Sequence, residues 1–176
     1  MTGAPAISIL AAEDVAGQLH ELGALLHACV HAGASIGFVL PFTQAESEAF
    51  WSDRVLPAMR GGGRLLWVAR QEGRIAGSVQ LGYDTPANQR HRADVSKLLV
   101  HPAFRRRGIA RALMAELERE AARLGRSLLT LDTRTGDMAE PLYASLGYRV
   151  AGVIPGYCRH PSEDRLDSTT IMYKAL

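Results

Sequence analysis

The sequence places three consecutive arginines, Arg105, Arg106 and Arg107, directly before Gly108 and a segment with the apolar spacing of a helix. The first amides of a helix have no acceptor within the helix, and the aligned peptide dipoles favour negative charge there. Gly108 lets an anion approach the backbone without meeting a Cβ, and Ala110 keeps the next turn shallow. The pattern therefore predicts a phosphate-binding turn. The alternative interpretation is a solvated basic turn before an ordinary helix.

This turn lies between an expected strand and an expected helix of a single mixed α/β domain. Continuous or alternating apolar runs predict strands, and apolar residues three and four positions apart predict amphipathic helices. Thr43 and Glu46 have the spacing of a capping box at a helix start. We expect strands at residues 6–10, 65–70, 75–83, 91–100, 128–132, 148–154 and 169–173, and helices at 15–30, 43–59, 107–124 and 139–146.

The composition argues against several classes of function. The 176 residues carry 20 Lys and Arg against 18 Asp and Glu, without the large basic excess of a general nucleic-acid or membrane-surface binder. The turn lacks both the Gly-Lys-Ser/Thr of a Walker loop and the first two glycines of the dinucleotide fingerprint. Cys29 and Cys158 lie far apart and the histidines have no ligand spacing, so we expect reduced thiols and no metal. No signal peptide or apolar span is found, and a cytoplasmic protein is expected.

Two motifs resemble those of the GCN5-related N-acetyltransferases, the GNAT family. Arg105-x-x-Gly108-x-Ala110, after a strand that ends Leu98-Leu99-Val100, resembles motif A, and PLYASLGY at 141–148 resembles motif B. The resemblance covers about residues 65–176. It implies an α/β fold with a mixed, mostly antiparallel sheet of six or seven strands. The sheet would be splayed between the fourth and fifth strands and flanked by about four helices.

The resemblance also implies an N-acetyltransferase that uses acetyl-coenzyme A as cosubstrate. The single domain would consist of an acceptor-binding part at 1–63, a coenzyme-binding core at 64–154 and a C-terminal strand at 155–176. The end of the fourth strand would pair with the pantetheine arm, and the basic turn would hold the pyrophosphate. The cofactor-binding residues implied in this way are Leu98, Leu99, Val100, Arg105, Arg106, Arg107, Gly108, Ile109, Ala110 and Arg111.

Acetyl transfer to an amine needs a neutral nucleophile, a donor to the tetrahedral oxyanion and a proton for the leaving thiolate. Asp94 is the first candidate base, directly or through water; the family has Glu there, and the alternative is an ion pair with Arg90 or Arg92. Asp132, which ends the next strand, is the second candidate, with a turn cap as its alternative. Motif B implies Tyr143 as the acid, although a helical Tyr is often only part of a core. Strand alternation is expected to place four side chains on one face: Asp94, Ser96, Leu98 and Val100.

One departure from the family pattern concerns the pantetheine. Gly136 stands where many relatives carry an Asn that bonds it, and Arg134 or Thr135 is the candidate replacement. The oxyanion donor is expected to be the main-chain amide of Val100 or its neighbour. The candidate acceptor walls lie between the first two helices and after the sixth strand, at Ser35, Phe38 and Tyr157; Tyr157 is equally well explained as a surface aromatic.

A closer resemblance, to the tabtoxin-resistance acetyltransferases, extends over segments 31–38, 65–68, 92–100 and 131–136 and the C-terminal tail. It implies a small acceptor amine such as a tabtoxin-like β-lactam, an antibiotic or an amino-acid derivative, and hence a role in toxin or antibiotic resistance. The family resemblance also suits a homodimer. The alternatives are acetylation of a protein or peptide, and a non-catalytic acyl-coenzyme A-binding regulatory module.

Overall fold

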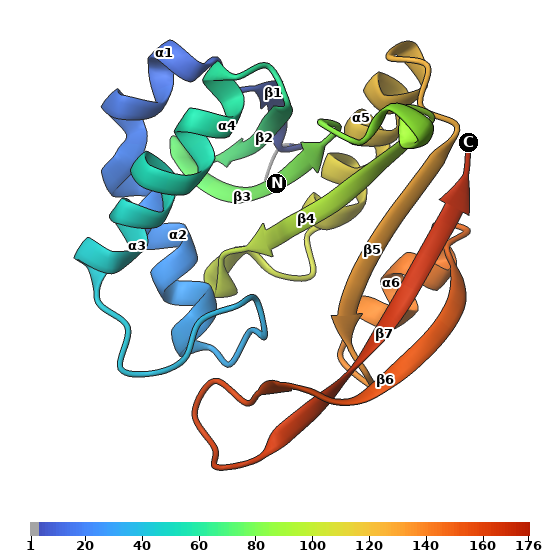
Figure 1. Cartoon of the computed structure of the whole chain (residues 1–176). Coiled ribbons are helices and arrows are strands. Elements are labelled where there is room, and N and C mark those ends of the chain that lie inside the picture. The colour runs from blue at the N-terminus through green and yellow to red at the C-terminus, as the bar shows by residue number, and fades with distance from the viewer. Residues whose placement is uncertain (1–3) are drawn as a thin grey trace.

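The chain folds around one seven-stranded sheet in the computed structural model, which describes residues 4–176. The strand order is β1-β2-β3-β4-β5-β7-β6 (Figure 1). All neighbouring strands are antiparallel except β4 and β5. The strands are β1 (Ala6–Ile9), β2 (Arg64–Gln71), β3 (Arg74–Gly82), β4 (Arg92–Val100), β5 (Leu128–Arg134), β6 (Arg149–Arg159) and β7 (Leu166–Ala175).

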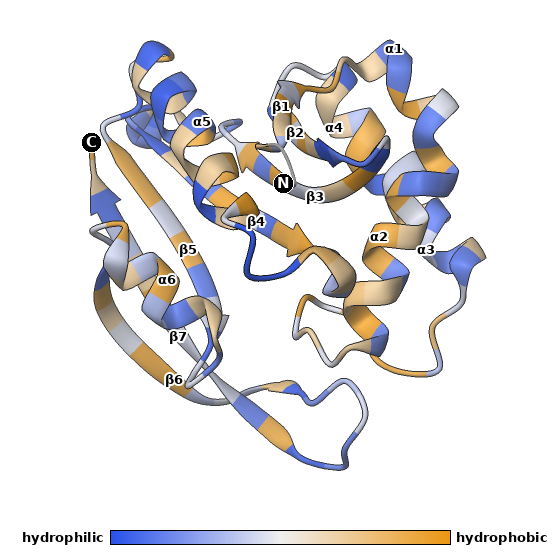
Figure 2. Ribbon diagram, turned by 180° about the vertical axis from the view of Figure 1, so that it is seen from behind, coloured by the Kyte–Doolittle hydropathy of each residue, from blue (hydrophilic) through white to orange (hydrophobic). Residues whose placement is uncertain are grey.

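Helices cover both faces of the sheet. The apolar side of α5 packs on one face with α6 beside it, and α2, α3 and α4 pack on the other (Figures 1 and 2). A π-helical turn (Trp51–Val55) joins α3 to α4, and the predicted capping box of Thr43 and Glu46 begins α3. No helix in the described part of the chain has the length and apolar character of a membrane span. The α-helices are α1 (Ala12–Val15), α2 (Leu19–His31), α3 (Gln44–Phe50), α4 (Leu56–Arg60), α5 (Ile109–Arg123) and α6 (Ala139–Ser145).

The parallel pair at the centre of the sheet comes apart after three residue pairs. Arg92, Ala93 and Asp94 of β4 pair with residues 128–130 of β5, and beyond Asp94 the two strands diverge (Figure 1). The end of β4 therefore presents backbone amides and carbonyls on the side of β5 without a strand partner there. This arrangement confirms the predicted mixed sheet that is splayed between the fourth and fifth strands.

A β-bulge in β4 overturns the expectation that Asp94, Ser96, Leu98 and Val100 share a face. Ser78 of β3 pairs with Leu99 and Gln80 pairs with Ser96, so Lys97 and Leu98 together lie opposite one residue of β3. A bulge of this kind reverses the alternation of the residues that follow it. Side chains up to Ser96 and those after the bulge consequently alternate in opposite phase.

Three expected boundaries differ for local reasons. The helix predicted from residue 107 begins at Ile109, because Gly108 has a left-handed conformation with φ +78°. The helix predicted at 15–30 is interrupted by a 3-10 turn at Ala16–Gln18. Strand β6 extends to Arg159 because its pairing with β7 resumes at Cys158 after an irregularity at residues 155–157, so Tyr157 lies within the sixth strand and not after it.

Candidate functional site

A cavity of about 730 Å³ opens at the wide end of the splay between β4 and β5. This volume lies within the range of small-molecule and cofactor sites. Its walls come from the end of β4, the start of α5, the loop before α6, and the C-terminal end of α2. The predicted cofactor residues among its lining are Leu98, Leu99, Val100, Arg105, Arg106, Gly108, Ile109, Ala110 and Arg111.

The turn before α5 has the geometry of an anion site. Arg106 and Gly108 both have positive φ, +63° and +78°, so the backbone turns sharply just before the helix. The α5 helix is 15 residues long, and its first amides have no acceptor within it. Among the described residues, neither Arg105 nor Arg106 forms an ion pair with an acid. The turn therefore presents uncompensated positive charge and free amides at the cavity.

Arg107 differs from its two neighbours. Its guanidinium donates to a Glu72 carboxylate oxygen over 2.9 Å and to the Ala103 carbonyl oxygen over 3.3 Å. It also lies 5.1 Å from the centroid of the Phe104 ring. These contacts hold Arg107 beside β2 and β3, and it does not line the cavity.

Asp94 lies where β4 and β5 are still paired. Its carboxylate accepts hydrogen bonds from the Arg92 guanidinium and from the Thr130 hydroxyl of β5. Asp94 does not line the cavity, which begins four residues further along β4. The structure therefore places this acid in an ion pair at the narrow end of the splay.

Asp132 lies further along the opposite arm and is exposed. The Thr169 hydroxyl is 3.5 Å from its Oδ2 atom and makes a shorter bond, 3.0 Å, to the Thr133 carbonyl oxygen. No ion pair among the described residues involves Asp132. Like Asp94, Asp132 does not line the cavity, but it lies two residues before Arg134, which does.

Tyr143 is 6% exposed on α6, and its ring centroid lies 5.7 Å from that of Tyr148. Burial raises the pKa of Tyr143, and the nearby charges of Asp132 and Asp137 raise it further. The phenol therefore keeps its proton at neutral pH. Its neighbours on α6, Leu142 and Ser145, line the cavity.

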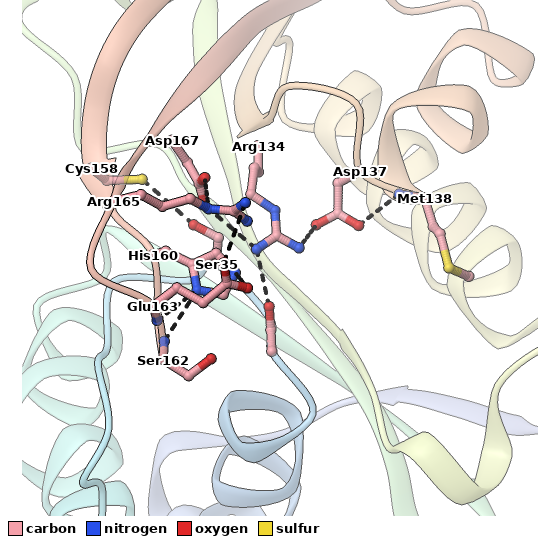
Figure 3. A network of polar contacts seen from close by, with 11 residues as sticks. Ser35, Arg134, Asp137, Met138, Cys158, His160, Ser162, Glu163, Arg165 and Asp167 are labelled. Carbon is pink, nitrogen blue, oxygen red and sulfur yellow. Dashed lines mark hydrogen bonds and ion pairs between the residues drawn. The ribbon is translucent and has the colours of Figure 1, made fainter.

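The expected acceptor walls meet at the tip of the β6–β7 hairpin. The Ser35 hydroxyl lies 3.5 Å from the Sγ atom of Cys158 (Figure 3), next to the exposed Tyr157. The Leu40 amide donates to the Pro161 carbonyl oxygen over 2.8 Å. Phe38 lies 5.2 Å edge-on from Phe50 of α3. The loop after α2 is therefore in contact with the hairpin on the far side of the splay.

Comparison with known proteins agrees with these features. Residues 61–150 match the model of the acetyltransferase (GNAT) domain. An uncharacterized N-acetyltransferase in the hisH-hisA intergenic region of Azospirillum brasilense is 35% identical over 128 residues, which are 71% of this chain and 73% of that protein. The chain belongs to the GNAT family of N-acetyltransferases.

Solved structures show the same GNAT fold over nearly the whole chain. The ribosomal-protein-alanine N-acetyltransferase of Brucella melitensis is 24% identical with a TM-score of 0.76, covering 97% of this chain and 99% of that one. The yncA protein of Salmonella typhimurium, solved with its cofactor acetyl-CoA, is 22% identical with a TM-score of 0.77, covering 99% and 95%. At these identities the likeness extends to the fold alone.

Sequence reasoning missed part of this GNAT cavity. The sequence indicates Arg134 only as a replacement for the Asn that bonds the pantetheine in many relatives. In the structure, Arg134 lines the cavity, and its guanidinium makes polar contacts with several segments (Figure 3). The Gly136 amide donates to Glu140 over 2.8 Å, and the Thr135 hydroxyl lies 2.9 Å from that of Thr170. Arg134 is therefore the better placed of the two candidate replacements. Ala34, which begins the predicted acceptor wall at 34–38, also lines the cavity. The remaining lining residues, to which no site role was assigned, are Cys29, Ala32, Gly33, Asp137, Met138, Ala139, Pro141, Leu142 and Ser145.

Proposed function

We propose that the protein transfers the acetyl group of acetyl-CoA directly to the primary amine of a small molecule in a ternary complex. The observation that carries the choice of a small acceptor is the contact between the loop after α2 and the β6–β7 hairpin. The bond from the Leu40 amide to Pro161 and the Ser35–Cys158 contact join segments on opposite sides of the splay. An extended peptide needs an open groove, and these contacts obstruct one.

Acetyl-CoA fits the cavity by the chemistry of its walls. The free amides and arginines of residues 105–111 suit the pyrophosphate, and the unpaired β4 edge at Leu98, Leu99 and Val100 suits the amide-bearing pantetheine arm. When bound, acetyl-CoA supplies an activated thioester. We assign to Arg134 the polar contact with the pantetheine that an Asn makes in many relatives.

Asp132 is the proposed base, directly or through one water, because it is exposed and unpaired whereas Asp94 is held by Arg92 and Thr130. An α-amine with a pKa of about 8 requires only about 1.4 kcal/mol for deprotonation at neutral pH. The neutral nitrogen forms a bond to the carbonyl carbon, and the Val100 amide donates to the resulting oxyanion.

Collapse of the tetrahedral intermediate breaks the carbon–sulfur bond, and the sulfur takes the electron pair. Tyr143 is the proposed hydrogen-bond donor to this sulfur: because its phenol has a raised pKa, it stabilises the developing thiolate and keeps its own proton. The thiolate takes the proton that the nitrogen loses as the amide forms. The tabtoxin-like, antibiotic or amino-acid identity of the acceptor, the homodimer and the cytoplasmic location are further parts of the proposal.

The test is a mass-spectrometric screen for acetylated products after incubation with acetyl-CoA and a panel of small amines and peptides. We expect products from small amines only. Asp132→Asn should lower kcat about 100-fold or more, while Asp94→Asn is the matched control with a smaller effect. Gly108→Asp, which puts a carboxylate in the anion turn, should abolish binding. Acetylation of peptides in preference to small amines, or coenzyme binding without any turnover, would overturn the proposal.

A further inference from the structure

Lys97 occupies a strained position where β4 leaves β5. It sits in the bulge with φ +51°, a left-handed conformation that is unfavourable for residues other than glycine. The next residue, Leu98, lines the cavity. The Lys97 ammonium lies 5.7 Å from the centroid of the Phe50 ring on α3. This contact directs the Lys97 side chain to the face of the sheet that carries α2, α3 and the loop after α2.

The Lys97 ammonium has no ion-pair partner in the part of the chain that the structure describes. No hydrogen bond or ion pair within residues 4–176 engages it, and its contact with a described side chain is with an aromatic ring. Burial lowers the pKa of Lys97, with the charge of Asp132 acting in the opposite direction and that of Arg64 in the same one. A mostly buried ammonium without an acidic partner is costly, and a bound anion would offset this cost.

The neighbours of Lys97 on the same face also offer donors. Arg64 of β2 donates to the Oε1 atom of Gln80 over 2.7 Å, which orients the amide. Gln80 is fully buried and pairs in register with Ser96, the residue before Lys97. The Gln80 Nε2 atom and the Arg64 Nε atom are buried and have no acceptor among residues 4–176. The β4 side of the splay thus carries positive charge and unmet donors.

Asp132 carries the opposite charge on the other arm. Leu129 and Leu131 of β5 pack in the core on the α5 side. Thr130 lies between them and Asp132 follows Leu131, so by strand alternation both face the other side of the sheet, as Lys97 does. Asp94 and Thr130 form the last pair of the two strands, and Lys97 and Asp132 follow them by three and two residues, so the two charges lie on opposite arms near the start of the splay. The charge of Asp132 accordingly acts to raise the pKa of Lys97. A ligand between them would be recognised best if it carried both signs of charge.

We propose that Lys97 determines the specificity of the acceptor site by binding an anionic group, such as a carboxylate, that the acceptor carries beside its amine. The proposal rests on the proposed function and adds a requirement to it: the acceptor is a zwitterion whose amine is directed to Asp132. Lys97 contacts the part of the acceptor that does not react. Replacing Lys97 therefore changes the preference of the enzyme among acceptor amines.

The test compares amines with a free carboxylate against the same amines as carboxamides, using an amino acid panel and its amides. For the wild type we expect kcat/KM to favour the acid about 10-fold or more, the worth of a hydrogen bond between two charged groups. Lys97→Met should reduce this ratio to near one, and Lys97→Arg should retain most of it. Lys174→Met is the matched control, because this lysine pairs with Glu118 far from the splay and its loss should leave the ratio unchanged.

Calorimetric binding of the same acids and amides to the coenzyme A complex provides a readout that does not depend on turnover. A preference for acids that persists in Lys97→Met, in turnover or in binding, overturns the role of Lys97 while the proposed function stands. If the wild type acetylates none of the amines, the proposed function fails, and the calorimetric preference for acids over amides alone tests the role of Lys97. Equal binding of acid and amide by the wild type would then overturn the role of Lys97 in binding an anionic group.

Discussion

The Arg134 guanidinium donates a hydrogen bond to the Gly33 carbonyl oxygen over 3.2 Å, and this contact joins the two arms of the splayed sheet. Arg134 ends β5, whereas Gly33 follows α2, which packs on the other arm. The same guanidinium pairs with Asp137 at 3.1 Å and with Asp167 of β7 at 3.6 Å (Figure 3). One side chain thus connects three segments at the wall of the cavity.

Replacing this arginine should loosen that connection. In Arg134→Met we expect a loss of about 1–3 kcal/mol in the free energy of unfolding, because the arginine is only 21% exposed, Asp137 loses its ion-pair partner and Asp167 keeps only its pair with Arg165. Urea unfolding measures the loss. Arg159→Met is the control, since its pair with Asp164 is exposed and should change stability by less than about 0.5 kcal/mol. Equal effects would contradict the bridging role.

The arginines of the anion turn should contribute unequally to coenzyme binding. Arg106 lines the cavity without an acidic partner, whereas Arg107 is held by Glu72. We expect Arg106→Ala to weaken coenzyme A binding about 10-fold and to reduce its salt dependence, because a charge near the pyrophosphate is lost. Arg107→Ala should change the affinity less than about 3-fold. Titration calorimetry at two salt concentrations distinguishes them, and a larger effect of Arg107 would refute this assignment.

Gly77 of β3 should be intolerant of even one methyl group. A Cβ there would lie 2.7 Å from the Leu99 carbonyl oxygen and 2.9 Å from the Cγ2 atom of Ile109. Gly77→Ala should therefore cost about 1–3 kcal/mol in stability and weaken coenzyme binding, since Leu99 and Ile109 both line the cavity. Gly17→Ala, where a Cβ meets nothing within 4 Å, is the control. If thermal and chemical unfolding show no loss of stability in Gly77→Ala, β4 and α5 can shift to accommodate the methyl group, and the prediction is wrong.

The buried thiol of Cys29 should make stability fall at alkaline pH. Burial raises the pKa of Cys29 from 9.0 to about 11, although Arg105 acts in the opposite direction. Folding favours the neutral thiol, so its contribution is complete below pH 9 and is lost as the pH rises toward 11. The loss of unfolding free energy between pH 8 and 10.5 should be smaller in Cys29→Ala than in the wild type. Cys158→Ala, which removes the other thiol, is the control, and identical losses in all three proteins would exclude this linkage.

The elements were largely predictable because their signals are local. The capping box at Thr43 and the glycine at 108 each determine a helix start through residues within a few positions. Strand length was harder to predict. Residues 155–159 of β6 include Pro155 and Gly156, which argue against a strand; residues 155–157 have no partner on β7, but the pairing resumes where Cys158 lies opposite Asp167. Tertiary pairing overrides local preference there.

The sequence by itself determined the anion turn that we propose holds the coenzyme, because the arginines, Gly108 and the helix start are consecutive in the chain and form an anion site wherever the helix begins. Only the tertiary structure decided the acceptor half. The bulge at Lys97 reversed the alternation of the side chains along β4. An ion pair with Arg92 holds Asp94 and so distinguishes it from Asp132, the other candidate base. Contacts such as Arg134 to Gly33 join residues about a hundred positions apart, and no local pattern encodes which distant groups will meet across a splayed sheet.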